Sequence, residues 1–283
     1  MNVHLAHRHR LKIRMRIPVR ISFRHSLQQN KMTTPPVDFD LISSLEERAF
    51  NAWPAQKSAL RGGWLLRLSE GYTKRANSAN ALRPAVAFSE TLQVVESFYA
   101  RHGLPAIFRL SPLAGAEPDR ALDQAGYRKI DRTLVMTASL ATSAHTSTSH
   151  DVVIEAAASD AWSAGFSQAN GVPSASQATH DRMLAAITMP AAFATLIENG
   201  TPVAYGLAVA ENGLIGLFDI VVAPDARRCG AATRLVTALL EWGQAQRATR
   251  AYLQVVADNV PAIALYRKLG FDEQYEYHYR IRP

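Results

Sequence analysis

The sequence is poor in cysteine and has no long hydrophobic run. Its only cysteine among 283 residues is Cys229. A single cysteine excludes an intramolecular disulfide and a cysteine-based zinc site, and it favours a reducing, cytoplasmic compartment. We therefore predict no metal site. No apolar run approaches the ~18 residues that cross a bilayer, so we predict no membrane-spanning segment.

Acidic residues are absent from residues 1–31, which hold eight of the chain's lysines and arginines. Removing these eight charges from the formal net charge of +7 leaves −1 for the rest. The composition therefore predicts no nucleic-acid binding through the folded core. We interpret residues 1–31 as a disordered extension, or as sequence upstream of a working start at Met32. A targeting peptide, or an arm for nucleic acid or membrane surfaces, is the open alternative.

The remaining chain divides at residues 139–150, a stretch of small and polar residues without pattern that indicates a linker. We predict two domains, at residues 32–138 and 151–283. Periodicity predicts helices and strands in both, and Asn-Gly pairs predict hairpin turns in the second. The predicted helices are 40–53, 89–101, 119–125, 159–166 and 179–186, and the predicted strands are 63–68, 106–110, 127–137, 152–156, 192–198, 203–210 and 214–222.

The two domains match each other at a shift of 144 residues, without a gap. The matched pairs are Phe98 with Trp242, Phe108 with Tyr252, Gly126 with Gly270 and Tyr127 with Phe271. The order of the predicted elements also agrees, which indicates a duplicated fold. The first copy has Leu122 where the second has Tyr266, so we expect chemistry only in the second copy.

The second copy carries the motif Arg227-x-x-Gly230-x-Ala232 between an apolar strand and a helix. Backbone N–H groups at such a helix start can hold a pyrophosphate, and Gly230 would allow its close approach. Arg227 and Arg228 oppose the helix dipole unless an anion binds there. Cys229 is interpreted as a small residue whose backbone N–H serves the same loop.

These residues, with Asn259 and the segment Leu265-Tyr266-x-x-x-Gly270-Phe271, resemble the GCN5-related N-acetyltransferase (GNAT) superfamily. The resemblance implies an α/β fold with two tandem GNAT-like halves, each a mixed sheet with flanking helices, the first half degenerate. It implies acetyl-CoA as co-substrate, held in a gap between strands 214–222 and 251–256. The implied contacts are Val221, Val222, Arg227, Arg228, Cys229, Gly230, Ala231, Ala232, Thr233, Asn259 and Tyr266. Asn259 is equally suited to capping the helix that follows it.

Two residues are the catalytic candidates. Tyr266, placed near the sulfur, would protonate the departing thiolate. Asp219 would accept the proton of the amine, directly or through water, although a backbone carbonyl with a water chain would also suffice. His278, on the final strand, is a weaker candidate for the base.

The sequence thus predicts an N-acetyltransferase that moves acetyl from acetyl-CoA to an amine by direct attack in a ternary complex. The acceptor is a small molecule or a peptide, and neither its identity nor the oligomeric state follows from the sequence. The alternative is a non-catalytic module that binds or senses acyl-CoA, which would not need Tyr266.

Overall fold

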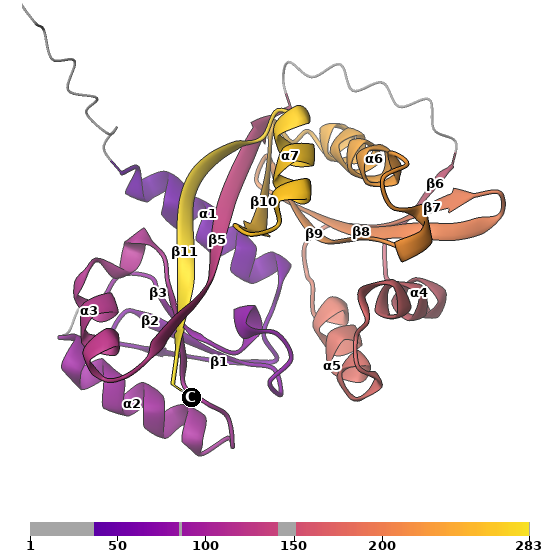
Figure 1. The fold of residues 1–283 in the computed structure, drawn as a ribbon. Helices are drawn as coiled ribbons and strands as arrows, with labels where there is room; N and C mark the ends of the chain where they lie inside the picture. The colour runs from indigo at the N-terminus through magenta and orange to yellow at the C-terminus, as the bar shows by residue number, and fades with distance from the viewer. Residues whose placement is uncertain (1–36, 85–86, 141–150, 283) are drawn as a thin grey trace, which may run out of the picture. The chain divides into compact units, whose positions relative to one another are not determined.

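The computed structural model describes residues 37–84, 87–140 and 151–282 (Figure 1). The predictions for residues 1–31 and for all but the first two residues of the linker lie outside these ranges. The fold is mixed α/β, as predicted. Within the described residues, no helix is both long and apolar enough to cross a membrane.

The strands of the described chain form one sheet rather than one sheet per half. Only the pairs β3/β4 and β9/β10 are parallel, and the other neighbours are antiparallel. Asn199-Gly200 and Asn212-Gly213 form the predicted turns, with positive φ at all four residues. In spatial order the strands are β1 (Lys57–Arg61), β2 (Trp64–Leu68), β3 (Ala79–Ala81), β4 (Ile107–Leu110), β11 (Asp272–Ile281), β5 (Arg128–Ser139), β10 (Arg250–Val256), β9 (Leu214–Val222), β8 (Thr201–Glu211), β7 (Ala191–Glu198) and β6 (Val152–Glu155).

The two halves exchange their last strands. β11, from the second half, lies between β4 and β5 of the first, and β5 lies between β11 and β10. The repeat explains the exchange, because β4 and β10 are equivalent strands and offer equivalent edges. The repeat itself is confirmed: at the shift of 144, helix α2 (Phe88–Ala100) falls on α6 (Ala231–Ala245) and α3 (Glu117–Gln124) on α7 (Val260–Lys268).

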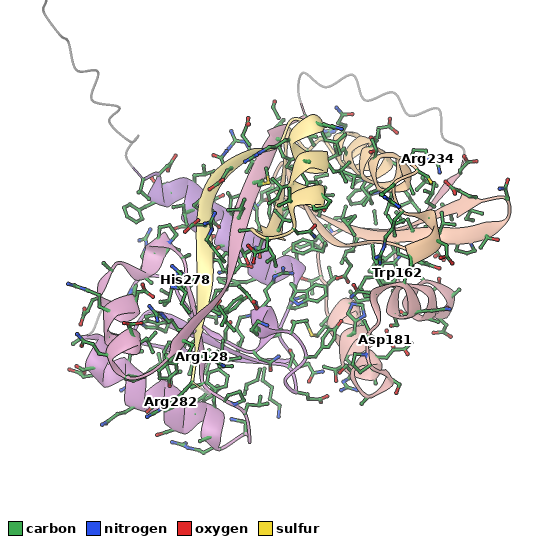
Figure 2. The ribbon with its side chains drawn as sticks, in the orientation of Figure 1. Arg128, Trp162, Asp181, Arg234, His278 and Arg282 are labelled. Carbon is green, nitrogen blue, oxygen red and sulfur yellow. The ribbon has the colours of Figure 1, made fainter. Side chains whose placement is uncertain are left out.

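Helices cover both faces of the strands β7 to β10 (Figure 1). On one face α6 and α7 bury an aliphatic core that includes Leu235 and Leu239. On the other face α4 (Asp160–Asn170) and α5 (Ser174–Ala185) share an aromatic core with α1 (Phe39–Ala52). Trp162 of α4 (Figure 2) donates from Nε1 to the carbonyl oxygen of Ala194 at 3.1 Å, which fixes α4 on the sheet.

Helix α1 belongs to the first half but packs on the aromatic core of both halves. Its start is set by Asp38, whose carboxylate accepts from the Leu41 backbone N–H at 2.9 Å. Its buried side chains recur at helical spacing and include Ile42, Leu45 and Ala49. This helix brings residues of the first half against the sheet of the second.

Candidate active site

Strands β9 and β10 part midway along their length. Their Cα pairing runs from Leu214 with Arg250 to Leu217 with Leu253 and stops there. Both strands continue, to Val222 and Val256 respectively. The gap opens at the carboxyl ends of two parallel strands, where α/β sheets commonly bind ligands. It includes Val221 and Val222, which the sequence predicted to contact the thioester and pantetheine end of the co-substrate.

The loop after β9 forms an anion-binding geometry. Arg228 and Gly230 have φ of +65° and +82°, and α6 begins directly afterwards at Ala231. Among the described residues, the backbone N–H groups of residues 228–233 have no hydrogen-bond acceptor. A Cβ added to Gly230 would meet no protein atom within 4 Å. The left-handed backbone and the open space together suit glycine and a close-lying phosphate.

The side chains of this loop are exposed and positively charged. Arg227 donates from Nε to the carbonyl oxygen of Val222 at 3.1 Å, which links the loop to the end of β9. The thiol of Cys229 is exposed, 3.6 Å from the carbonyl oxygen of Arg227. Within the described residues, neither Arg227 nor Arg228 forms a salt bridge. The loop therefore fits a pyrophosphate in shape and in charge.

Helix α7 begins beside this gap and carries two of the predicted residues. The Asn259 side chain accepts from the Ala262 backbone N–H at 3.3 Å and so caps the helix; its contact with the co-substrate stays a prediction. Tyr266 packs against Phe271, with ring centroids 5.8 Å apart, and its hydroxyl has no hydrogen bond to the described residues. Burial raises the pKa of Tyr266 to about 12, so the phenol keeps its proton at neutral pH.

Asp219 lies on a β-bulge of β9. Tyr205 pairs with Val221 and Leu207 with Phe218, so Asp219 and Ile220 together face Gly206. A Cβ at Gly206 would lie 2.7 Å from Cδ1 of Ile220, so this glycine makes room for the bulge. Asp219 has φ of +50°, an uncommon value for a non-glycine residue. A bulge re-aims a side chain, and strained backbone of this kind is concentrated at functional sites.

The bulge directs Asp219 toward α5. Its partner there is His180, which the sequence analysis did not predict. His180 Nε2 lies 2.9 Å from Asp219 Oδ2, and the imidazole is 0% exposed while the carboxylate is 13% exposed. The ring packs against Trp53, Tyr72 and Phe166. Asp219 is therefore only slightly exposed, and His180 is fixed behind it. The available signal was a histidine on the buried side of α5, at helical spacing from Met183 and Leu184.

The first half forms part of this site. Tyr72 and Trp53 touch the His180 ring, with centroids 5.4 and 5.7 Å away. Burial, together with the carboxylates of Asp219 and Asp181, raises the pKa of Tyr72. Glu70 accepts hydrogen bonds from Thr179 at 2.5 Å and from Arg182 at 2.6 Å, which ties this segment to α5. The degenerate half thus contributes side chains to the surroundings of Asp219.

His278 lies in a different environment. β11 is an interior strand of the sheet, and the His278 ring is 2.8 Å from Asp119 of α3 (Figure 2). Arg280 donates to the same carboxylate at 2.7 Å. Burial opposes ionisation of Asp119, but the hydrogen bonds from Arg280 and His278 outweigh it and lower the pKa to about 2. His278 is held in an ion-pair network of the first half, which argues against the role of base.

A pocket of about 360 Å³ lies beside α5, between the loop after β6 and the start of β7. It is lined mainly by alanine and aliphatic residues, with Asp160, Ser163 and Asp181 as polar members. Of these, Asp181 is labelled in Figure 2. None of the predicted site residues lines it. Among the described residues, no group of three or more potential metal ligands comes together.

Comparison with known proteins places the chain in a family. Residues 41–280 match the family model described as "Probable histone acetyltransferase Rv0428c C-terminal". The chain is 32% identical over 248 residues to the uncharacterized N-acetyltransferase YobR of Bacillus subtilis, covering 86% of this chain and 99% of YobR.

Solved structures share the fold. A GCN5-related N-acetyltransferase from Kribbella flavida superposes with a TM-score of 0.67 at 15% identity, covering 87% of this chain and 96% of that one. A tandem GNAT protein from the clavulanic acid biosynthesis pathway has a TM-score of 0.59 at 15% identity, with 88% of each chain covered. The chain therefore belongs to the Rv0428c C-terminal acetyltransferase family and is a GNAT-family acyltransferase with a tandem fold.

Proposed function

We propose that the second half transfers an acetyl group from acetyl-CoA to an amine by direct attack in a ternary complex. The observation that carries the proposal is the parting of β9 and β10 beyond Leu217 and Leu253. The extended pantetheine arm of acetyl-CoA needs a slot of this kind between two strands. The slot opens toward the backbone N–H groups of residues 228–233, which have no acceptor among the described residues. Acetyl-CoA supplies the activated acetyl group when bound.

Two residues, one on either side of the slot, would carry out the two proton transfers of the reaction. Asp219, held by His180, takes a proton from the attacking amine, whose nitrogen bonds to the acetyl carbon. As the carbon–sulfur bond breaks, Tyr266 gives its proton to the departing sulfur. The pKa of Tyr266, about 12, keeps that proton in place until the thiolate forms. The two residues lie on opposite faces of the sheet, because Tyr266 belongs to the α7 core and His180 to α5.

Calorimetric titration of acetyl-CoA into the full chain tests the proposal, with thiol release from a panel of amines as the second readout. We expect saturable binding that is lost in Arg227→Ala/Arg228→Ala. Arg247→Ala, an exposed arginine at the far end of α6, is the matched control and should bind normally. Absence of binding to folded protein would refute the proposal. Binding without thiol release from any amine would favour an acyl-CoA-sensing module instead.

A further inference from the structure

The pocket of about 360 Å³ between α4, α5 and the start of β7, called the α4–α5 pocket below, has the composition of a ligand site. Its volume is at the lower end of the ~300–1,000 Å³ found for ligand pockets, so it suits a small ligand. Alanines 156–158 and aliphatic side chains form most of its walls, with Phe193 as an aromatic member. Its polar members are Asp160, Ser163 and Asp181, and no lysine, arginine or histidine of the described chain lines it.

Asp181 on α5 (Figure 2) is a half-buried carboxylate without a partner in the described chain. Its Oδ1 is enclosed and has no hydrogen-bond donor there. The cation that follows it in sequence, Arg182, donates instead to Glu70 at 2.6 Å. A carboxylate taken out of water needs a hydrogen bond or a cation to compensate it. Asp181 therefore leaves an uncompensated negative charge at the wall of the pocket.

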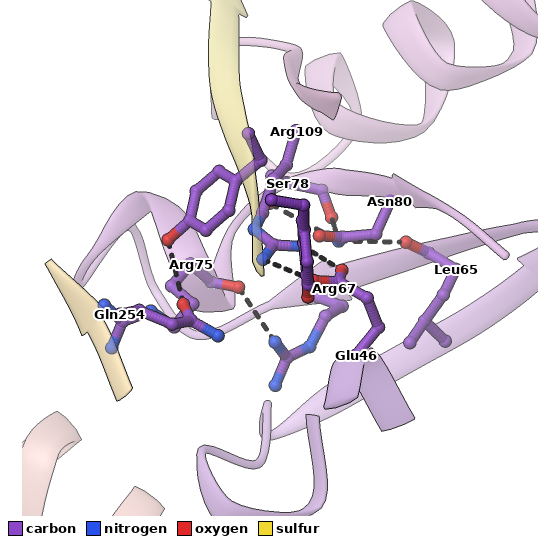
Figure 3. Close-up of polar contacts among 10 residues, drawn as sticks. Glu46, Leu65, Arg67, Arg75, Ser78, Asn80, Arg109 and Gln254 are labelled. Atoms are coloured by element: carbon purple, nitrogen blue, oxygen red, sulfur yellow. Dashed lines mark hydrogen bonds and ion pairs between the residues drawn. The ribbon is translucent and has the colours of Figure 1, made fainter. Parts of the chain in front are cut away.

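Buried charges of the first half show the contrast (Figure 3). Arg109 forms a two-pronged pair with the Glu46 carboxylate, and both side chains are 1% exposed. Arg67 donates to the carbonyl oxygen of Arg75 at 2.9 Å and to two carbonyl oxygens at the C-terminal end of α1, which carries partial negative charge. Asp181 has no comparable arrangement, so a ligand can supply the missing partner.

Ser163 on α4 is a second polar group without a partner in the described chain. The residue is 7% exposed and lines the same pocket. A hydroxyl can accept a hydrogen bond from an ammonium group whose charge is paired with a carboxylate. Asp160, exposed in the first turn of α4, adds negative charge to the pocket. The polar groups therefore favour a ligand that is positively charged and donates hydrogen bonds.

The walls of the pocket favour an organic cation over a metal ion. Among the described residues, no group of three or more potential metal ligands comes together. Divalent cations such as Ca²⁺ and Mg²⁺ take about six or more oxygen ligands, which alanine and aliphatic side chains cannot replace. The same side chains suit a short alkyl chain, because each buried methylene group strengthens binding.

The α4–α5 pocket is separate from the slot between β9 and β10. Successive residues of an α-helix point in directions about 100° apart. On α5, His180 contacts Asp219, whereas Asp181 lines the pocket. Asp219, Tyr266 and the loop 227–233 do not line it. A ligand in this pocket would therefore occupy a second site.

We propose that the α4–α5 pocket binds a small organic cation, a protonated primary amine with a short apolar body. The ammonium group pairs with the Asp181 carboxylate and donates to the Ser163 hydroxyl, and the alkyl chain lies against the alanine and aliphatic walls. The inference does not rest on the proposed function, because binding here requires neither acetyl-CoA nor transfer.

Calorimetric titration of the full chain with n-butylamine, without acetyl-CoA and at pH 7, where a primary amine is protonated, tests the proposal. The matched probe is 1-butanol, which has the same alkyl chain and no charge. We expect saturable binding of the amine, about 10- to 100-fold tighter than binding of the alcohol, the range for a hydrogen bond to a charged group. From ethylamine to butylamine the affinity should rise about fourfold per methylene group.

Three variants test the assignment of the site. Asp181→Asn keeps the shape of the side chain and removes its charge, so the ratio of the two affinities should fall close to one. Ala157→Phe, on the exposed loop after β6, should obstruct the pocket and weaken binding of both probes without changing the carboxylate. Asp272→Asn, an exposed aspartate at the start of β11, is the matched control and should bind as the wild type does.

The opposite results are equally clear. Equal affinity for amine and alcohol, an amine preference that survives Asp181→Asn, or no saturable binding of the amine to folded protein would overturn the inference. Asp219→Asn should keep the binding, because Asp219 does not line the pocket. Loss of binding in Asp219→Asn but not in Asp181→Asn would place the amine at the slot and also overturn it. The transfer reaction is tested separately, by thiol release.

Discussion

Nε2 of the His180 imidazole donates to the carboxylate of Asp219 across 2.9 Å, with the ring fully buried and the carboxylate in front of it. The pair joins α5 to the bulge of β9, two segments 39 residues apart in the chain. Because the ring is not exposed, His180 cannot touch a substrate in this arrangement. Under the proposed function, His180 would therefore act as a positioning residue, and Asp219 would be the group that meets the amine.

Replacing Asp219 by asparagine should lower kcat by about 10²- to 10⁴-fold, the usual contribution of a general base. His180→Phe keeps the aromatic packing and removes one hydrogen bond to a charged group, so we expect a loss of about 10- to 100-fold. Steady-state thiol release measures both, and acetyl-CoA affinity should not change. Asp225→Asn, an exposed aspartate beside the loop, is the control. Wild-type turnover in Asp219→Asn would eliminate it as the base.

Tyr266→Phe should lower kcat by about 10- to 100-fold, since it removes one proton donor, while the dissociation constant of acetyl-CoA stays within about twofold. Because burial raises the pKa of Tyr266 to about 12, the acid form persists throughout the assay range. The wild type should therefore show no loss of rate from Tyr266 ionisation below about pH 10. An alkaline limb centred near pH 9 that disappears in Tyr266→Phe would contradict this assignment.

Gly230→Glu should abolish acetyl-CoA binding in calorimetry. The new side chain would place a negative charge where the phosphates are expected and would strain a backbone with φ of +82°. Cys229→Ser changes the neighbouring side chain and keeps its N–H, so binding should stay within about twofold. Normal affinity in Gly230→Glu would move the phosphate site elsewhere, and a large loss in Cys229→Ser would assign the thiol a role of its own.

Asp119→Asn should make stability less sensitive to acid. The folded-state pKa of Asp119 is about 2, below its usual value, so its stabilising contribution is present above about pH 4. That contribution is lost as the pH falls from about 4 through 2. Urea unfolding at pH 5 and at pH 2.5 should show a larger drop for the wild type than for Asp119→Asn. Equal drops would mean that the pairs with Arg280 and His278 add no stability.

Cleavage within residues 141–150, at an inserted protease site, should leave the two pieces associated. β5 is hydrogen-bonded to β10 and β11, and β11 to β4, so separation would break three interior pairings. Size-exclusion chromatography of the cut protein should give one peak until denaturant is added. Residues 32–138 and 151–283 expressed alone should be poorly folded by circular dichroism. Two folded, separable pieces would show that each predicted domain is independent.

The sequence predicted the backbone of the loop and most of the element order, because the signals are local, but it did not predict the short strands β1 and β3. Arg227-x-x-Gly230-x-Ala232 is a contiguous motif, and the Asn-Gly turns need only their own backbone angles. The shift of 144 residues predicted equivalent helices for the same reason. What a strand pairs with depends on distant edges, so the exchange of β5 and β11 was not predictable from the periodicity of either strand.

His180 was missed for a related reason. The strand alternation that places side chains on alternate faces fails at the bulge of β9, so the direction of Asp219, and hence its partner on α5, was not predictable.

Gene duplication normally leaves one copy free to decay, be trimmed or be lost. In this chain the first half stabilises the second, because the strand next to β10 comes from the first half and the strand next to β4 from the second. Loss of the first half would leave β10 as an unpaired edge strand and would remove Tyr72 and Trp53 from beside His180. The copy without the Arg-x-x-Gly-x-Ala motif therefore supplies strands and core side chains that the other copy needs, so we expect the two copies to be retained together.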